Sequence, residues 1–127
     1  MLQRSYRILP VPFELPRWPA VIGLHYDLEG FRILLEDIAL PRTFRRFRVS
    51  FSSTPFAVHM IDEGNYLTTL TPGAGLVSEV ENSEYLEWFH RESQHVREGM
   101  NLKHYAIYSI NECFDIIHSE EPKICEL

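Results

Sequence analysis

The chain of 127 residues has 45% hydrophobic residues, 13% aromatic residues and a formal net charge of -6. This composition is typical of one packed domain with its own hydrophobic core, and it excludes a disordered chain. The acidic balance argues against a general nucleic-acid binder, because counterion release needs an excess of Lys and Arg facing the phosphates.

The charge is unevenly distributed along the chain. Residues 1–48 contain eight of the 12 Lys and Arg residues and five acids, whereas residues 49–127 contain four bases and thirteen acids. This pattern predicts a dipolar surface with a basic front and an acidic rear.

No segment of the sequence has the features of a membrane or export signal. The first residues lack the apolar run and cleavage site of a secretory signal, and no stretch approaches the roughly 20 apolar residues that span a bilayer. We therefore expect a cytoplasmic protein without a membrane partner. Its two cysteines, Cys113 and Cys125, are too few for a disulfide framework and are expected as thiols.

The start of the chain is rich in proline. Residues 9–19 contain four prolines, each of which removes an amide donor and fixes φ, so this segment is expected to be an extended arm or edge. Phe13 and Trp18 are expected to pin the arm to its own domain; the alternative is a Pro-rich ligand for an aromatic groove. We predict a single domain over 1–127, with 1–19 as the arm.

Residues 21–36 have the pattern of a β-hairpin. Turn residues at 27–30 separate two alternating segments, so that one side of the hairpin is apolar. The predicted facing pairs are Tyr26 with Phe31, Leu24 with Ile33, Ile22 with Leu35, His25 with Arg32 and Val21 with Glu36.

Residues 43–51, "TFRRFRVSF", predict a strand with a basic outer face. Phe47, Val49 and Phe51 alternate with Arg46, Arg48 and Ser50. The basic face could cradle an anion or phosphate, or it could pair with acids such as Glu36 or Asp37 on a neighbouring strand. Residues 56–70 predict two further short strands around turn residues 62–65, and residues 71–75 predict a loop.

Residues 83–97 have the pattern of an α-helix. Ser83 is a plausible N-cap, and Tyr85, Phe89 and Val96 share one stripe at the helical period, which predicts a helix that covers a sheet. Gly99 is a natural stop, and strands are expected to resume near Lys103. The fold class is therefore α+β, with a largely antiparallel sheet of about six or seven strands packed against this helix and a C-terminal β-hairpin.

Residues 104–119 contain the residue types of a nucleophile, a base and an orienting carboxylate. A hairpin that turns at Asn111 and Glu112 places Tyr108 opposite Asp115 and His104 opposite Ser119. His104 then lies roughly 20 Å from Cys113 along the ladder, and His118 points to the opposite face. We therefore expect no Cys-His-Asp catalytic unit and assign no catalytic residue.

The histidines do not predict a metal site. His90 and His95 lie about 140° apart around the helix, so they cannot share an ion, and the other four histidines are scattered over different strands. No phosphate-loop or nucleotide-binding glycine pattern is present. We expect no metal and no cofactor.

Residues 82–122 resemble a recurring pattern in small uncharacterised bacterial proteins. In that pattern a polar-capped helix with an aromatic pair precedes a strand that begins His-Tyr, an Asn-containing turn and a strand that ends near proline. The matching positions are Ser83, Trp88, Phe89, His104, Tyr105, Asn111, Asp115 and Pro122. Similar small acidic α+β proteins include immunity proteins that neutralise toxins, so the resemblance implies binding rather than catalysis.

The leading functional hypothesis is a non-enzymatic bacterial binding protein, immunity-like, that presents an acidic surface to a basic protein partner. That surface would comprise Glu79, Glu81, Glu84, Glu87 and Glu92.

Three alternatives stay open. The first is a small-molecule pocket or an enzyme, in which aromatic residues line the site and arginines bind an anion. Its residues would be Arg46, Arg48, Trp88, His104 and Tyr108. The second is an RNA contact through the basic strand, which the net charge disfavours. The third is a homodimer through an exposed edge near the Pro-rich arm.

Overall fold

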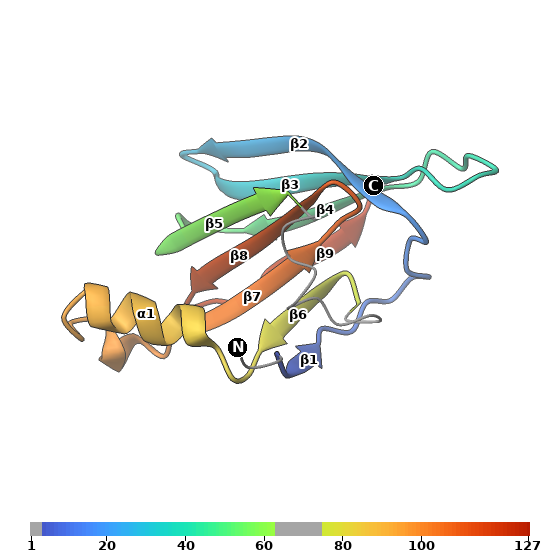
Figure 1. Cartoon of the computed structure of the whole chain (residues 1–127). Helices are drawn as coiled ribbons and strands as arrows, with labels where there is room; N and C mark the ends of the chain where they lie inside the picture. Colours follow the sequence, from blue (N-terminus) through green and yellow to red (C-terminus); the bar gives the residue numbers. More distant parts are fainter. Residues whose placement is uncertain (1–3, 63–74) are drawn as a thin grey trace.

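A computed structural model describes residues 4–62 and 75–127, which form two antiparallel sheets and one α-helix (Figure 1). The five-stranded sheet has the order β1-β6-β7-β8-β5 and the four-stranded sheet the order β2-β3-β4-β9. The strands are β1 (Tyr6–Ile8), β2 (Pro19–Asp27), β3 (Gly30–Asp37), β4 (Arg46–Phe51), β5 (Ala57–Asp62), β6 (Val77–Val80), β7 (Lys103–Tyr108), β8 (Glu112–His118) and β9 (Lys123–Glu126). The helix α1 spans Glu84–Glu92, and a short 3₁₀ helix spans Glu98–Met100.

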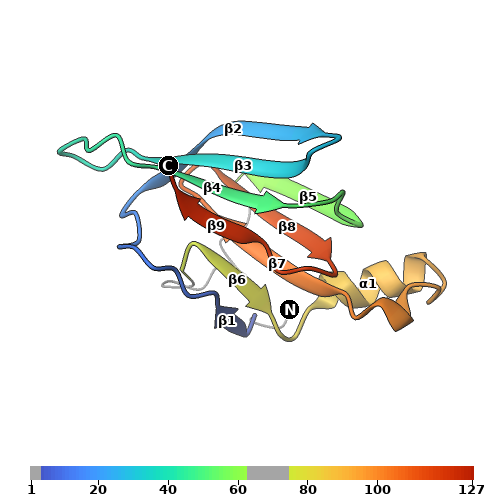
Figure 2. The same ribbon diagram turned by 180° about the vertical axis from the view of Figure 1, so that it is seen from behind.

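The two sheets lie one in front of the other in the views from both sides (Figures 1 and 2), and the hydrophobic core lies between them. The four-stranded sheet contributes alternate residues of β4, among them Phe47 and Phe51, and the five-stranded sheet contributes Tyr105 and Phe114. The rings of Phe51 and Tyr105 are 5.9 Å apart across the interface. Face-to-face packing of this kind buries one side of the central strands and leaves the other side for solvent or covering segments.

This arrangement corrects the expected packing against a main helix. The described chain contains nine strands rather than six or seven, and the second sheet takes the place expected for the helix. Helix α1 has no fully buried residue, and Val96, expected on its packing stripe, is 74% exposed. The α+β class, the antiparallel pairing and the C-terminal β7–β8 hairpin are confirmed.

The helix also ends at Glu92, five residues earlier than expected. The Ser93 hydroxyl donates a hydrogen bond to the Phe89 carbonyl at 2.8 Å, and Gln94 and His95 adopt positive φ values of 53° and 62°. Left-handed residues cannot continue an α-helix, so the helix stops although the amphipathic pattern runs on. The resumption of strand structure at Lys103 is confirmed.

The first hairpin keeps most of its predicted register. Tyr26 pairs with Phe31, Leu24 with Ile33 and His25 with Arg32, as expected. A β-bulge between Val21 and Gly23 then shifts the ladder by one residue. Val21 therefore faces Leu35 rather than Glu36, and Ile22 does not face Leu35.

The basic strand β4 pairs with acids on its neighbour. Glu36 lies opposite Arg46, and its carboxylate is 3.1 Å from Arg46 and 2.8 Å from Arg42. The alternation predicted for β4 is confirmed, because Phe47, Val49 and Phe51 are buried. The sequence allowed two interpretations of this basic face, anion binding or pairing with acids. Pairing with an acid is confirmed at Arg46.

The Pro-rich arm lies against both sheets. Within it, residues 6–8 form β1, which pairs with β6, and the Phe13 ring lies 5.2 Å from Phe47 in the core. Trp18, expected to anchor the arm, is 59% exposed instead. The second strand predicted after β5 and most of the loop at 71–75 lie outside the described residues.

Within residues 4–62 and 75–127, no helix has the length and apolar character needed to cross a bilayer.

Packing between the sheets predicts a clear contrast between two substitutions. Phe114→Ala removes a fully buried ring and should lower the free energy of unfolding by about 3–5 kcal/mol. Val96→Ala should change it by less than about 0.5 kcal/mol, because the side chain faces solvent. Urea unfolding of both variants measures the two values; a large loss for Val96→Ala would restore the helix-packed arrangement.

Candidate functional site

The β7–β8 hairpin has a different register from the one expected. Tyr108 pairs with Cys113 and His104 with Ile117, a shift of two residues. The hydroxyl of Ser109 donates to the Glu112 carbonyl at 2.7 Å and accepts from the Glu112 amide at 2.9 Å, which stabilises a four-residue loop. A shift of two preserves the faces, so His104 and Asp115 still point away from the core.

The new register brings His104 and Asp115 into contact. His104 Nε2 lies 2.6 Å from Asp115 Oδ1, and both side chains are only 1% exposed. The expected register held them four residues apart along the ladder, so sequence reasoning missed this pair. Diagonal neighbours on one face of an antiparallel pair are close enough for long side chains to meet.

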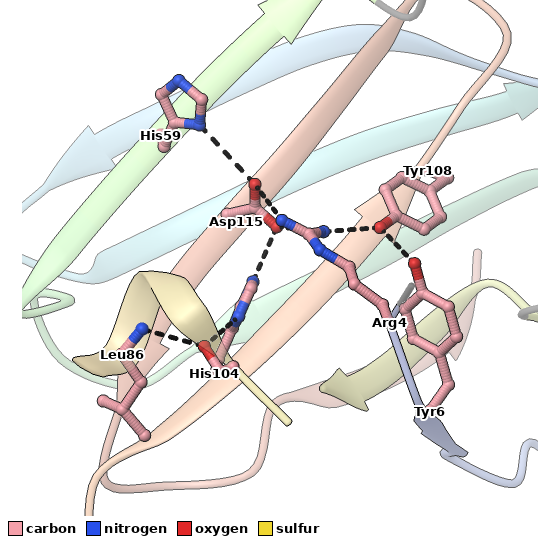
Figure 3. Close-up of polar contacts among 8 residues, drawn as sticks. Arg4, Tyr6, His59, Leu86, His104, Tyr108 and Asp115 are labelled. Carbon is pink, nitrogen blue, oxygen red and sulfur yellow. Dashed lines mark hydrogen bonds and ion pairs between the residues drawn. The ribbon is translucent and has the colours of Figure 1, made fainter. Parts of the chain in front are cut away.

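Arg4, just ahead of β1, forms a buried ion pair with Asp115 (Figure 3). Its Nη1 donates to Asp115 Oδ1 at 2.8 Å and to the Tyr108 hydroxyl at 2.6 Å, and its Nη2 donates to Oδ2 at 3.2 Å. The Tyr108 hydroxyl lies 2.7 Å from that of Tyr6 on β1. Arg4 was not among the predicted site residues, because nothing in its local sequence indicates a contact 111 positions away.

Ser83 connects this cluster to the start of α1. Its hydroxyl accepts a hydrogen bond from the Leu86 amide at 2.8 Å, which confirms the predicted N-cap, and lies 2.7 Å from His104 Nδ1. Because the carboxylate of Asp115 can only accept, His104 carries its proton on Nε2, and Nδ1 accepts from the Ser83 hydroxyl. We call Arg4, Ser83, His104, Tyr108 and Asp115 the buried polar cluster.

The cluster fixes the protonation of its members. Burial works to raise the pKa of Asp115, but hydrogen bonds from His104 and Arg4 outweigh it and hold that pKa well below its usual range. Burial lowers the pKa of His104, and the nearby Arg4 charge adds to this despite the opposing Asp115 hydrogen bond. Burial also raises the pKa of Tyr108. Near neutral pH the cluster therefore holds one cation, one anion and a neutral imidazole.

The order serine, histidine, carboxylate has the connectivity of a catalytic triad, but its surroundings oppose catalysis. The Ser83 residue is only 7% exposed, and its hydroxyl is already used as a helix cap. The Arg4 charge neutralises the carboxylate that would have to stabilise an imidazolium. The arrangement therefore suits a rigid support better than a nucleophile.

The thiol of Cys113 does not join a catalytic unit with either histidine of the hairpin. The ring nitrogens of His104 bond to Ser83 and Asp115. Those of His118 bond to Ser53 and to the Glu120 amide on the opposite face of the sheet. All four ring nitrogens are thus used elsewhere.

An aromatic rim lies over the buried polar cluster. Tyr85 packs edge-on against His104 at 5.4 Å and stacks on Trp88 at 5.7 Å. Trp88 is 44% exposed. His59 Nδ1 lies 3.5 Å from Asp115 Oδ2 while its side chain is 47% exposed. The cluster is therefore buried, but its rim is accessible to a partner.

The predicted acidic residues divide into two groups. Glu79 is paired with Arg7 at 2.8 Å and with Lys103 at 3.8 Å. The others lie exposed on α1 or on the turn before it, and no cation of the described chain lies within ion-pair distance of them. These are Glu81, Glu84, Glu87 and Glu92.

The predicted ligand-binding residues do not converge. His104, Tyr108 and Trp88 lie beside the outer face of the five-stranded sheet, whereas Arg46 and Arg48 lie on the outer face of the four-stranded sheet. The core separates the two groups, so no single pocket joins them. Among the described residues no group of three or more His, Cys, Asp or Glu side chains could hold a metal ion.

Comparison of the chain with protein-family models, with curated protein sequences and with solved structures gives no match. What this site does must therefore be inferred from its own residues.

The hydroxyl of Ser83 should make a measurable contribution to stability. Ser83→Ala removes the helix cap and leaves His104 Nδ1 without its donor, so the free energy of unfolding should fall by about 1–3 kcal/mol. Ser93→Ala is the matched control, because its back-bond to a helix carbonyl stabilises little. Equal losses for the two variants in urea unfolding would contradict the assigned role of Ser83.

The protonation of His104 predicts a pH dependence of folding. Its folded-state pKa lies below the unfolded value of about 6.5, so the unfolded chain binds a proton first as the pH falls through that value. Asp115 acts in the same direction at lower pH, since its stabilisation is lost as the carboxylate is protonated. The free energy of unfolding should therefore be smaller at about pH 5.5 than at about pH 7.5.

Chemical unfolding at both pH values measures this dependence. His104→Gln should weaken it, whereas His25→Gln, at an exposed position on β2, should leave it unchanged. A dependence that survives in His104→Gln at full size would show that the buried imidazole is not its source.

Proposed function

We propose that this chain is a non-catalytic binding protein that contacts a basic protein partner through helix α1. The contact surface comprises Glu81, Glu84, Glu87, Trp88 and Glu92, which we call the acidic surface. The observation that carries the proposal is the concentration of exposed carboxylates here, with no cation of the described chain within ion-pair distance.

Carboxylates elsewhere in the described chain are mostly paired. Glu36 pairs with Arg42 and Arg46, Asp115 with Arg4, and Glu126 with Arg45 at 2.9 Å. The acidic surface therefore differs from its surroundings in having charge that a partner could neutralise. Complementary charge of this kind accelerates association and suppresses wrong partners, more than it adds affinity.

Trp88 supplies the apolar anchor that such a surface needs. Its ring is exposed but stacked on Tyr85, with an angle of 8° between the ring planes, and is therefore held in one orientation. Tyr85 packs in turn on His104, and Ser83 fixes the start of the helix on the same imidazole. A pre-ordered tryptophan lowers the entropy cost of binding, and tryptophan is enriched among residues that dominate interfaces.

An immunity-like role gives the most specific form of this proposal. The helix and hairpin that carry the site lie within the segment that resembles small bacterial proteins, a group that includes toxin-neutralising ones. The partner would then be a toxin with a basic functional face, which the acidic surface would cover. Cys113 and Cys125 form no disulfide in the described structure, and the proposal keeps the cytoplasm as the place of binding.

Affinity capture from the native host tests the proposal. The immobilised chain should retain a basic protein at low salt and release it as the salt concentration rises. Glu84→Gln/Glu87→Gln should lower the association rate for that protein by roughly tenfold, and Trp88→Ala should increase the dissociation rate. Surface plasmon resonance measures both rates.

The matched control removes the same charge elsewhere. Glu14→Gln/Glu112→Gln neutralises two carboxylates outside α1 and should leave both rates within about twofold of the parent chain. Failure to capture any basic protein at low salt, or equal effects of the two double variants, would refute the proposal. For the immunity-like form, co-expression with the captured protein should also restore host growth.

A further inference from the structure

The outer face of the four-stranded sheet contains a hollow of about 290 Å³ that the proposed function does not use. Arg32, Arg48 and Lys123 form its walls, and Ser50 and Ser52 lie among them. Arg32, Arg48, Ser50 and Lys123 belong to strands β3, β4 and β9. These strands are part of the sheet that faces the viewer in Figure 2.

The strand register explains why a hollow forms there. Ser50 pairs with Arg32 on one side and with Lys123 on the other, so it lies at the centre of a three-strand row. Residues two apart on a strand share a face, so Arg48 lies beside Ser50 along β4, and Ser52 follows directly after the end of the strand. Two short serine side chains among three long cationic ones leave a depression lined by hydroxyl and cationic groups.

Two of the three cations have no carboxylate partner in the described chain. Arg32 is paired with Asp27 at 2.8 Å. Arg48 and Lys123 form no ion pair with any described carboxylate, whereas the neighbouring Arg46 on the same strand is held by Glu36. The hydroxyl of Ser50 likewise makes no hydrogen bond within the described residues.

The three carboxylates at the edge of the hollow have partners other than Arg48 and Lys123. Glu120 Oε2 accepts a hydrogen bond from the Ser52 hydroxyl at 2.6 Å, and Glu121 lies 2.9 Å from Arg7 of the other sheet. Glu29 lies 3.7 Å from Arg32 and is 86% exposed. None of the three carboxylates lies within ion-pair distance of Arg48 or Lys123.

We propose that this hollow is a binding site for a phosphate group. Arg48 presents a planar fork of N–H donors, Lys123 a mobile ammonium group and Ser50 a hydroxyl donor, and together they match the oxygens of a compact dianion. Arg32, whose charge is already paired with Asp27, lies in the wall of the site. The site lies across the core from the buried polar cluster and does not depend on the acidic surface.

Titration with inorganic phosphate, followed by amide NMR spectra of the full chain, tests the assignment. Sodium chloride is exchanged for phosphate at constant ionic strength, so that screening does not change. The amides of Arg48, Ser50 and Lys123 should shift in a saturable way. Arg48→Gln should weaken the apparent affinity at least tenfold, and Arg46→Gln, one register position away and paired with Glu36, should leave it within twofold.

Lys123→Gln provides a second variant, and unchanged signals outside the hollow show that each variant is folded. The proposal is overturned if no amide of the hollow shifts by about 20 mM phosphate, which would mean an affinity too weak for a specific site. It is also overturned if Arg46→Gln and Arg48→Gln have equal effects. Saturable shifts with a short single-stranded RNA and none with phosphate would replace it by a nucleic-acid contact.

Discussion

The buried carboxylate of Asp115 is the constraint on which the outer side of the five-stranded sheet depends. A buried charge is tolerated only when it is paired and fully hydrogen-bonded, and Arg4 and His104 supply those partners. Meeting this requirement joins three segments that are distant in sequence: residue 4 ahead of β1, the hairpin of β7 and β8, and, through His104 and Ser83, the first turn of α1. The helix that carries the acidic surface therefore begins at a point fixed by a buried charge.

The same cluster shows why a triad-like geometry does not imply catalysis. A nucleophile must be accessible, and the carboxylate behind its base must be able to stabilise an imidazolium, whereas here the serine is a buried helix cap and Asp115 is already paired with Arg4. What reaches the surface is an aromatic and acidic rim at one side of the sandwich. On its opposite side, Arg32 of β3, Arg48 of β4 and Lys123 of β9 line the hollow. The uneven distribution of charge along the sequence is reflected, within the described residues, in the unpaired carboxylates on and just before α1 and in the unpaired Arg48 of β4, for which we propose different partners.

Local patterns predicted much of this architecture. Alternation assigned the inner and outer faces of β4, β7 and β8, turn residues near Asp27 fixed the first hairpin, and Ser83 was identified as a helix cap. Three features depended on information that no local pattern contains. Local patterns predict single strands, but they do not show how the strands divide between two sheets. The Ser109 hydroxyl lengthened the β7–β8 loop and moved Asp115 toward His104. The contact of Arg4 with Asp115 links opposite ends of the chain.

The central claim, that the Arg4–Asp115 pair holds these segments together, is tested most directly by a double-mutant cycle. The free energies of unfolding of Arg4→Gln, Asp115→Asn and the double variant are compared with that of the parent chain. A coupling energy above about 1 kcal/mol is the predicted result, because each single change leaves a buried partner unsatisfied. Additive effects, equal within about 0.5 kcal/mol, would contradict the claim.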